Sequence, residues 1–152
     1  MSDFWQIVLG AFLAIVGGAA NNELSEWRSR CRERKAVSIS ISDELTEIIQ
    51  LLEKIKTVWE ATHTLIPSYI KDLKTCTGAY DGLRQRLFLV KNEELRKDIT
   101  TFYRDLKSAV NSDMRKAGSL SRSEDAQKEQ SEIATKFINF ISQADKIKSK
   151  LK

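Results

Sequence analysis

An apolar run near the start of the chain constrains its fold more than any other sequence feature. Residues Phe4–Ala20 carry no formal charge, and Gln6 is their only strongly polar side chain. The hydrocarbon core of a bilayer is about 30 Å thick and takes about 20 helical residues, within a range of about 17 to 25. A surface helix shows one apolar stripe, whereas this run is apolar on every side. The run therefore predicts a short transmembrane helix.

The charges that flank the run predict its orientation. No Lys or Arg precedes it, and five follow it within a few turns: Arg28, Arg30, Arg32, Arg34 and Lys35. Basic residues beside a span stay in the cytoplasm, so we expect the N-terminus outside and residues 21–152 in the cytoplasm. The same residues suit contact with anionic lipid headgroups, although Glu23, Glu26 and Glu33 are available to pair with them.

Two tryptophans bracket the apolar run, Trp5 before it and Trp27 after it. Tryptophan is enriched at both membrane–water interfaces. The predicted membrane-interface residues are therefore Trp5, Trp27, Arg28, Arg30, Arg32, Arg34 and Lys35. For Trp27 the alternative is a packing role on the first turns after the membrane.

Small residues repeat at four-residue spacing inside the run, at Gly10, Ala14 and Gly18. Such a face lets two helix backbones approach closely in lipid, so these three residues are the predicted helix-association face. A secretory signal peptide is an alternative for the run, because Gly18-Ala19-Ala20 is similar to a cleavage site. However, a signal peptide has a basic n-region, and Met-Ser-Asp has no base. The other alternative is the buried first helix of a soluble all-α protein.

The rest of the chain is predicted to be helical, because it holds one proline, Pro67, and three of the six glycines lie in the apolar run. The predicted fold class is all-α, with a single N-terminal transmembrane helix followed by a cytosolic antiparallel four-helix bundle. We expect a transmembrane helix with a basic juxtamembrane extension over residues 1–36. A linker over 37–41 and the bundle over 42–152 follow, and the linker is expected to be extended or irregular because Val37–Ser42 alternates apolar and polar residues.

Four apolar stripes predict the four bundle helices. The first starts at Ser42 as its N-cap and ends near His63, with Asp43 and Glu44 in its first turn. The second runs from Pro67 to about Val90 and contains Gly78 and Gly82, which favour a close helix crossing over a kink or a break. The third covers residues 93–117 with Asn92 as its cap and Gly118 after its end. The fourth begins near residue 124, capped by Ser121 or Ser123.

No pattern in the sequence predicts chemistry. His63 is the only histidine, and Cys31 and Cys76 lie far apart without the spacing of a metal site. The segment GAYDG lacks the lysine and the spacing of a phosphate-binding loop. We therefore expect no catalytic, cofactor-binding or metal-binding residue and no enzymatic activity, and no small-molecule substrate is evident.

Nucleic acid is not favoured as a partner. Several bases gather near the predicted second loop: Arg84, Arg86, Lys91, Arg96 and Lys97. Acidic residues are mixed among them, and no nucleic-acid-binding motif is present. The expected partners are instead the lipid bilayer and either another protein or a second copy of this chain.

The sequence favours a membrane-anchored helical-bundle protein that acts as an interaction or scaffold module on the cytoplasmic face. The first alternative is an oligomeric membrane effector, a pore or permeabilising protein with a cytosolic helical sensor. Only Gln6 is available as a polar lining residue in such a pore. The second alternative is a soluble all-α protein whose first helix is buried.

Overall fold

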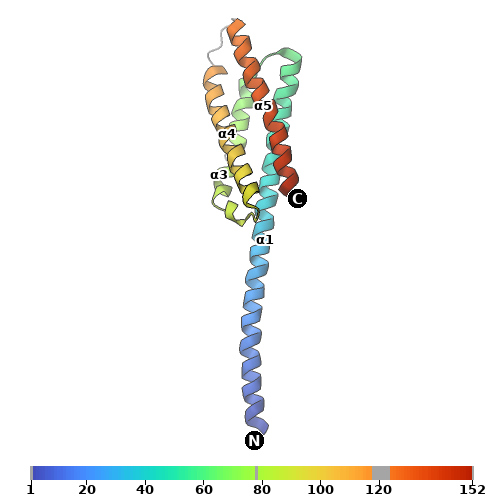
Figure 1. The fold of residues 1–152 in the computed structure, drawn as a ribbon, viewed down its shortest axis with the longest axis vertical. Coiled ribbons are helices and arrows are strands. Elements are labelled where there is room, and N and C mark those ends of the chain that lie inside the picture. The colour runs from blue at the N-terminus through green and yellow to red at the C-terminus, as the bar shows by residue number, and fades with distance from the viewer. Residues whose placement is uncertain (1, 78, 118–123, 152) are drawn as a thin grey trace. The chain divides into compact units, whose positions relative to one another are not determined.

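The computed structural model of this chain describes residues 2–77, 79–117 and 124–151, and within them the side chains of residues 21–77, 80–112 and 127–151. It consists of helices (Figure 1): α1 (Ser2–Thr62), α2 (Pro67–Cys76), α3 (Ala79–Arg84), the 3₁₀ turn η1 (Leu87–Leu89), α4 (Glu93–Ala117) and α5 (Glu124–Leu151). No strand occurs in these described ranges. The predicted all-α fold is confirmed.

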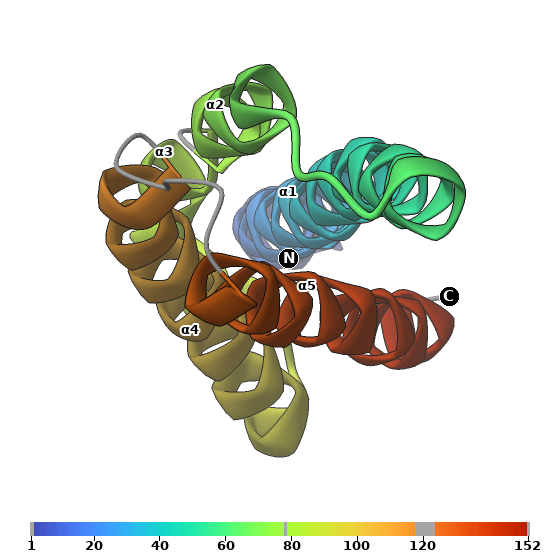
Figure 2. The same cartoon turned by 90° about the horizontal axis from the view of Figure 1, so that it is seen from above.

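The chain forms two compact units, unit 1 (Met1–Ala36) and unit 2 (Val37–Lys152). Unit 2 holds four helical segments, which are the part of α1 from Val37 onward, α2 with α3, α4 and α5. Consecutive segments run in opposite directions (Figure 1), and they surround a shared centre when viewed along the bundle (Figure 2). Unit 2 is therefore the predicted antiparallel four-helix bundle.

The predicted extended linker at residues 37–41 is wrong, because this segment is part of α1. Val37 and Ile41 are buried in the core of unit 2, at 3% and 0% exposure, while Ile39 is 49% exposed. A four-residue step returns to the same face of a helix, so Val37 and Ile41 face the bundle together. The alternation over Val37–Ser42 is too short to distinguish the two-residue period of an extended chain from the 3.6-residue period of a helix.

The predicted helix start at Ser42 is also wrong, because α1 passes through this residue without interruption. The carbonyl of Ser42 accepts a hydrogen bond from Thr46 Oγ1 at 2.7 Å, as in a helix interior. The predicted end near His63 is confirmed. There His63 has a φ of 50° and its backbone N–H donates to the Trp59 carbonyl at 2.9 Å.

The predicted second helix is broken into three pieces, α2, α3 and η1. Pro67 begins α2 as expected, because its missing N–H costs nothing in a first turn. Gly78 lies outside the described residues. A Cβ placed on Gly82 would meet no atom within 4 Å, so the predicted close crossing at this glycine is wrong. Glycine inside a helix instead destabilises the helix by about 1 kcal/mol relative to alanine, which is consistent with the short length of α3.

Replacing Gly82 with alanine is expected to raise the free energy of unfolding of unit 2 by about 0.5 to 1 kcal/mol, through lower backbone entropy in the unfolded chain. No glycine described in the structure has a positive φ, so alanine fits the backbone without strain. Guanidinium denaturation followed by circular dichroism measures the change. A loss of stability in G82A would show that this position does need glycine.

The bounds predicted for the third helix are confirmed by α4, and its cap is confirmed too, because Asn92 Oδ1 accepts a hydrogen bond from the Leu95 N–H at 3.2 Å. The residues predicted to follow α4 and to cap α5, Gly118, Ser121 and Ser123, lie outside the described part of the chain. The apolar stripes of α1, α4 and α5 form most of the observed core. Its largest fully buried side chains are Tyr103, Phe102, Phe137, Ile41, Leu45, Ile48, Leu52, Ile70, Leu73, Ile99, Leu106 and Val110.

Within the described residues, the structure contains no helix that is both long enough and apolar enough to cross a membrane. The predicted span, Phe4–Ala20, has a helical backbone as part of α1, but its side chains lie outside the described residues.

Candidate functional site

The end of unit 1 carries exposed apolar and basic side chains on one stretch of α1. Trp27 is 62% exposed and Leu24 is 46% exposed. We call this stretch the basic–aromatic segment and define it by six exposed residues: Leu24, Trp27, Arg28, Arg30, Arg32 and Lys35. An exposed indole among guanidinium and ammonium groups is the side-chain chemistry that suits a membrane–water interface.

Most of these bases are free of acidic partners. Arg30 Nη2 lies 3.3 Å from Glu26 Oε2, and both side chains are largely exposed. An exposed pair of this kind contributes about 0 to 1 kcal/mol, so it leaves Arg30 available to other anions. For Arg28, Arg32 and Lys35, the described side chains include no ion-pair partner.

The other predicted site residues fall into two groups. Arg34 is half-buried, and its Nε is enclosed without a hydrogen-bond partner among the described groups. Trp5 and the helix-association residues Gly10, Ala14 and Gly18 lie in the part of α1 whose side chains are not described. The structure therefore gives no side-chain contacts at these four positions.

Among the described side chains of unit 2, one carboxyl group is buried, that of Glu44 on α1, which is 6% exposed. Its Oε1 accepts a hydrogen bond from the Tyr80 N–H at 3.1 Å. Its Oε2 is buried and has no partner in the described part of the chain, and the same is true of the Tyr80 and Tyr103 hydroxyl groups. Glu44 therefore connects α1 to α3 through a hydrogen bond from the Tyr80 backbone. Its Oε2 and two tyrosine hydroxyl groups are buried polar atoms without a partner among the described groups.

Two tyrosines lie next to this carboxyl group. The rings of Tyr80 and Tyr103 are stacked, with centroids 3.9 Å apart and planes 5° apart. Lys107 Nζ lies 5.6 Å from the Tyr80 ring centroid and 2.5 Å from Asp81 Oδ1. Lys107 thus forms an ion pair with the exposed Asp81 and not with Glu44.

Burial raises the pKa of Glu44 from 4.5 to about 7, and the hydrogen bond from Tyr80, the nearby Tyr103 hydroxyl and the charge of Lys107 only partly oppose this rise. Burial next to the Glu44 charge also raises the pKa of Tyr103. The core of unit 2 thus contains a carboxyl group whose protonation changes near neutral pH.

The burial of Glu44 was not predicted, because the predicted helix start at Ser42 places this residue in a first turn, where acids are favoured by the helix dipole. A usable signal was present, since Glu44 follows Ile41 by three residues and precedes Ile48 by four, which places it on the apolar face of a continuous helix. Only the wrong helix start at Ser42 concealed that spacing.

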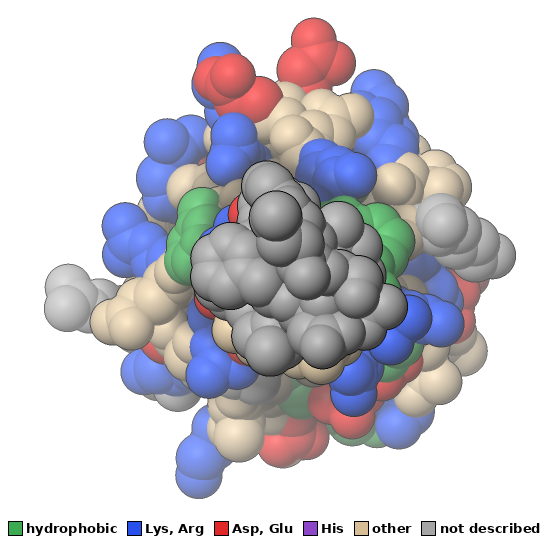
Figure 3. Space-filling model, turned by 90° about the horizontal axis from the view of Figure 1, so that it is seen from below, with side chains coloured by type: hydrophobic (Ala, Val, Ile, Leu, Met, Phe, Trp, Pro, Cys, Tyr) green, Lys and Arg blue, Asp and Glu red, His purple; other side chains and the backbone are tan. Residues whose placement is uncertain are grey.

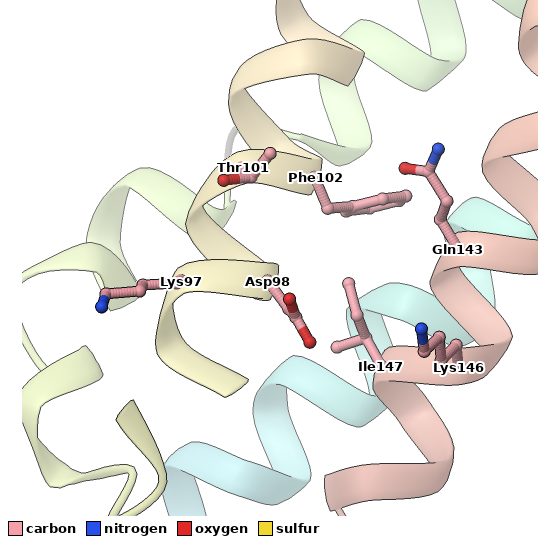
Figure 4. A pocket seen from close by; sticks show the side chains of 7 residues that line it. All are labelled: Lys97, Asp98, Thr101, Phe102, Gln143, Lys146 and Ile147. Carbon is pink, nitrogen blue, oxygen red and sulfur yellow. The ribbon is translucent and has the colours of Figure 1, made fainter. Parts of the chain in front are cut away.

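A shallow hollow of about 250 Å³ lies between α4 and α5 (Figure 4). Phe102 and Gln143 point towards each other across it, and Lys97 points away from it. Asp98 is held at its edge by Lys150 at 2.7 Å, which lowers the pKa of Asp98. The volume is below the range of about 300 to 1,000 Å³ that small-molecule sites occupy, and no buried polar group marks a ligand position.

The described side chains include no group of three or more His, Cys, Asp or Glu placed to hold a metal ion. Cys31 and Cys76 are free thiols, both half-buried, and burial raises the pKa of Cys76. Comparison of the chain with protein-family models, with curated proteins and with solved structures finds no match. The basic–aromatic segment is therefore the candidate site, on the strength of its own chemistry.

Proposed function

We propose that this chain is a membrane-anchored, non-enzymatic interaction protein. Residues Phe4–Ala20 anchor it, the basic–aromatic segment lies at the cytoplasmic membrane surface, and the helical bundle of unit 2 binds a partner protein or a second copy of the chain. The bundle is the part that recognises the partner, because it is the part with a packed core and a defined surface.

One observation carries this proposal. Trp27 is 62% exposed beside exposed arginines, in the turns that directly follow a run without charge. In water an exposed tryptophan gains nothing from its position. At a lipid interface its ring is partly dehydrated and the neighbouring bases meet anionic headgroups, at about 1 kcal/mol per basic residue.

Alkaline carbonate extraction of membranes tests the anchor. We expect the full chain to stay in the membrane pellet. Replacing Ile15 with lysine places a charge inside the apolar run, which costs about 2.5 to 3.5 kcal/mol at the centre of a spanning helix. The I15K variant should therefore move substantially into the supernatant.

A matched control makes the same substitution outside the run. Ile39 lies on α1 with a 49% exposed side chain, so I39K leaves the anchor intact and should stay in the pellet. Recovery of the unmodified chain in the carbonate supernatant, or as a monodisperse species without detergent, would contradict the anchor. It would favour the alternative of a buried first helix.

A further inference from the structure

Among the described side chains of unit 2, the turn between α3 and α4 exposes the most accessible large apolar one. Phe88 in η1 is 69% exposed, while its neighbours Leu87 and Val90 are buried. The buried pair fixes the turn to the core, and hydrogen bonds from Leu89 N–H to the Arg86 carbonyl and from Val90 N–H to the Leu87 carbonyl, both 3.0 Å, close it. Phe88 is thus held outward by a well-anchored turn.

Three bases lie close to Phe88 along the chain. Arg86 and Lys91 are exposed on either side of it, and Arg96 Nη1 donates to the Phe88 carbonyl at 3.4 Å. Arg86, Lys91 and Arg96 have no ion-pair partner among the side chains that the structure describes. We call these four residues, Arg86, Phe88, Lys91 and Arg96, the Phe88 turn.

The surrounding end of unit 2 is also basic. Lys150 Nζ of α5 lies 2.7 Å from Asp98 Oδ2 near the start of α4, the helix that carries Arg96. The last turns of α5 therefore bring Lys146 and Lys148 to the same end of unit 2. Glu93 is paired with Lys97 at 3.0 Å. Figure 3 shows Lys and Arg side chains on this face of the molecule, with acidic side chains between them.

We propose that the Phe88 turn docks onto an anionic lipid surface, with the phenyl ring entering the headgroup region and the three bases contacting lipid phosphates. A single exposed apolar residue is ordinary on a protein surface. Here an exposed ring is held by an anchored turn that also carries bases with no ion-pair partner among the described side chains. This turn combines both attractions that bind peripheral segments to anionic membranes. This inference rests on the proposed function, which places the chain at a membrane.

Lipid is favoured over nucleic acid by the number of aromatic rings. Binding of single strands uses several aromatic side chains on which successive bases stack. Among the described side chains of unit 2, Phe88 is the only exposed large aromatic residue. One ring with flanking bases fits a surface of headgroups, which requires no series of stacking positions.

Fluorescence of a label at position 88 tests the inference in the full chain. The native cysteines are replaced (C31S, C76A), Phe88→Cys carries a nitrobenzoxadiazole label, and the protein is reconstituted into vesicles whose lipids carry nitroxide quenchers. We expect loss of emission in vesicles with phosphatidylglycerol and little loss in vesicles of phosphatidylcholine alone. The loss should weaken with added salt, because screening shortens the reach of the bases.

The control label is placed at Ile66→Cys, an exposed residue, 38% accessible, in the loop at the opposite end of the bundle (Figure 1). It should not be quenched. A triple variant, R86Q/K91Q/R96Q, should lose the quenching at position 88. The matched triple variant of exposed lysines elsewhere on unit 2, K54Q/K71Q/K128Q, should keep it.

The outcomes separate this inference from the proposed function. If the protein floats with the vesicles and position 88 stays unquenched, the Phe88 turn does not bind lipid, and the anchor stands. If the protein does not float with vesicles of either composition, the proposed function and the inference fall together. Emission at position 88 that responds to added DNA and not to quencher lipids would overturn the inference in favour of nucleic acid.

Discussion

Replacing Ile41 with alanine is expected to lower the free energy of unfolding of unit 2 by about 2 to 5 kcal/mol, because the change removes fully buried methyl and methylene groups and leaves a cavity in the bundle. Ile41 is 0% exposed and belongs to the same core as Leu45 and Ile48. Guanidinium denaturation followed by far-ultraviolet circular dichroism measures the loss.

Ile39 provides the matched control, since the same substitution is made two residues away on the same helix. Its side chain is 49% exposed, so I39A should change the free energy of unfolding by no more than about 0.5 kcal/mol. Equal, small effects of I41A and I39A would mean that residues 37–41 do not pack into the bundle and that the segment behaves as a linker.

The second large effect concerns the buried carboxyl group of Glu44. Glutamine keeps the shape of this side chain and removes its charge. We expect E44Q to stabilise unit 2 by about 1 to 3 kcal/mol at pH 8 and to change its stability little at pH 5, because only the charged form is penalised by burial.

The direction of the pH dependence follows from the raised pKa. The pKa of Glu44 is about 7 in the folded protein against 4.5 for the ordinary group, so the folded state holds the proton more tightly. The stability that this group contributes is fully present below about pH 4.5 and is lost as the pH rises through about 7. A difference of this size corresponds to about 3 kcal/mol at most.

The measurement is the free energy of unfolding of the unmodified chain and of E44Q at pH 5 and pH 8. The control is E53Q, which removes an exposed carboxyl group from the same helix. E53Q should change the free energy of unfolding by less than about 0.5 kcal/mol, and by the same amount at pH 5 and at pH 8. A pH dependence that persists unchanged in E44Q would show that another group is responsible.

Local patterns predicted the helices well where the signal was repeated over many turns. The stripes of α4 and α5 and the Asn92 cap were readable because apolar residues recur at three- and four-residue steps for 25 and 28 residues. The stripe of the predicted second helix was readable too. The sequence did not show whether this helix is continuous, because its two glycines leave a straight helix, a kinked helix and a broken helix close in free energy. The packing of Leu73, Tyr80 and Leu87 against the rest of unit 2 decides among them.

The candidate site divides in the same way. The basic–aromatic segment was predictable from the order of charged and apolar residues alone, and the structure adds that Trp27 is exposed. The Phe88 turn was visible only as a cluster of bases mixed with acids. Its exposed ring was not predictable, because the stripe places Leu87 in the core but does not show that a 3₁₀ turn directs the next side chain outward.

The sequence by itself determined that the chain is helical, that its first 20 residues differ from the rest, and that positive charge follows them. These properties depend on neighbours along the chain, which a helix brings together at every third and fourth residue. Only the tertiary structure decided that α1 continues through residues 37–42, that Ile41 and Glu44 are buried, and that Glu44 meets Tyr80 and Tyr103. Those facts depend on contacts between residues far apart in the sequence, such as Glu44 and Tyr103, which are 59 positions apart. No local pattern fixes which distant surface a helix face will cover.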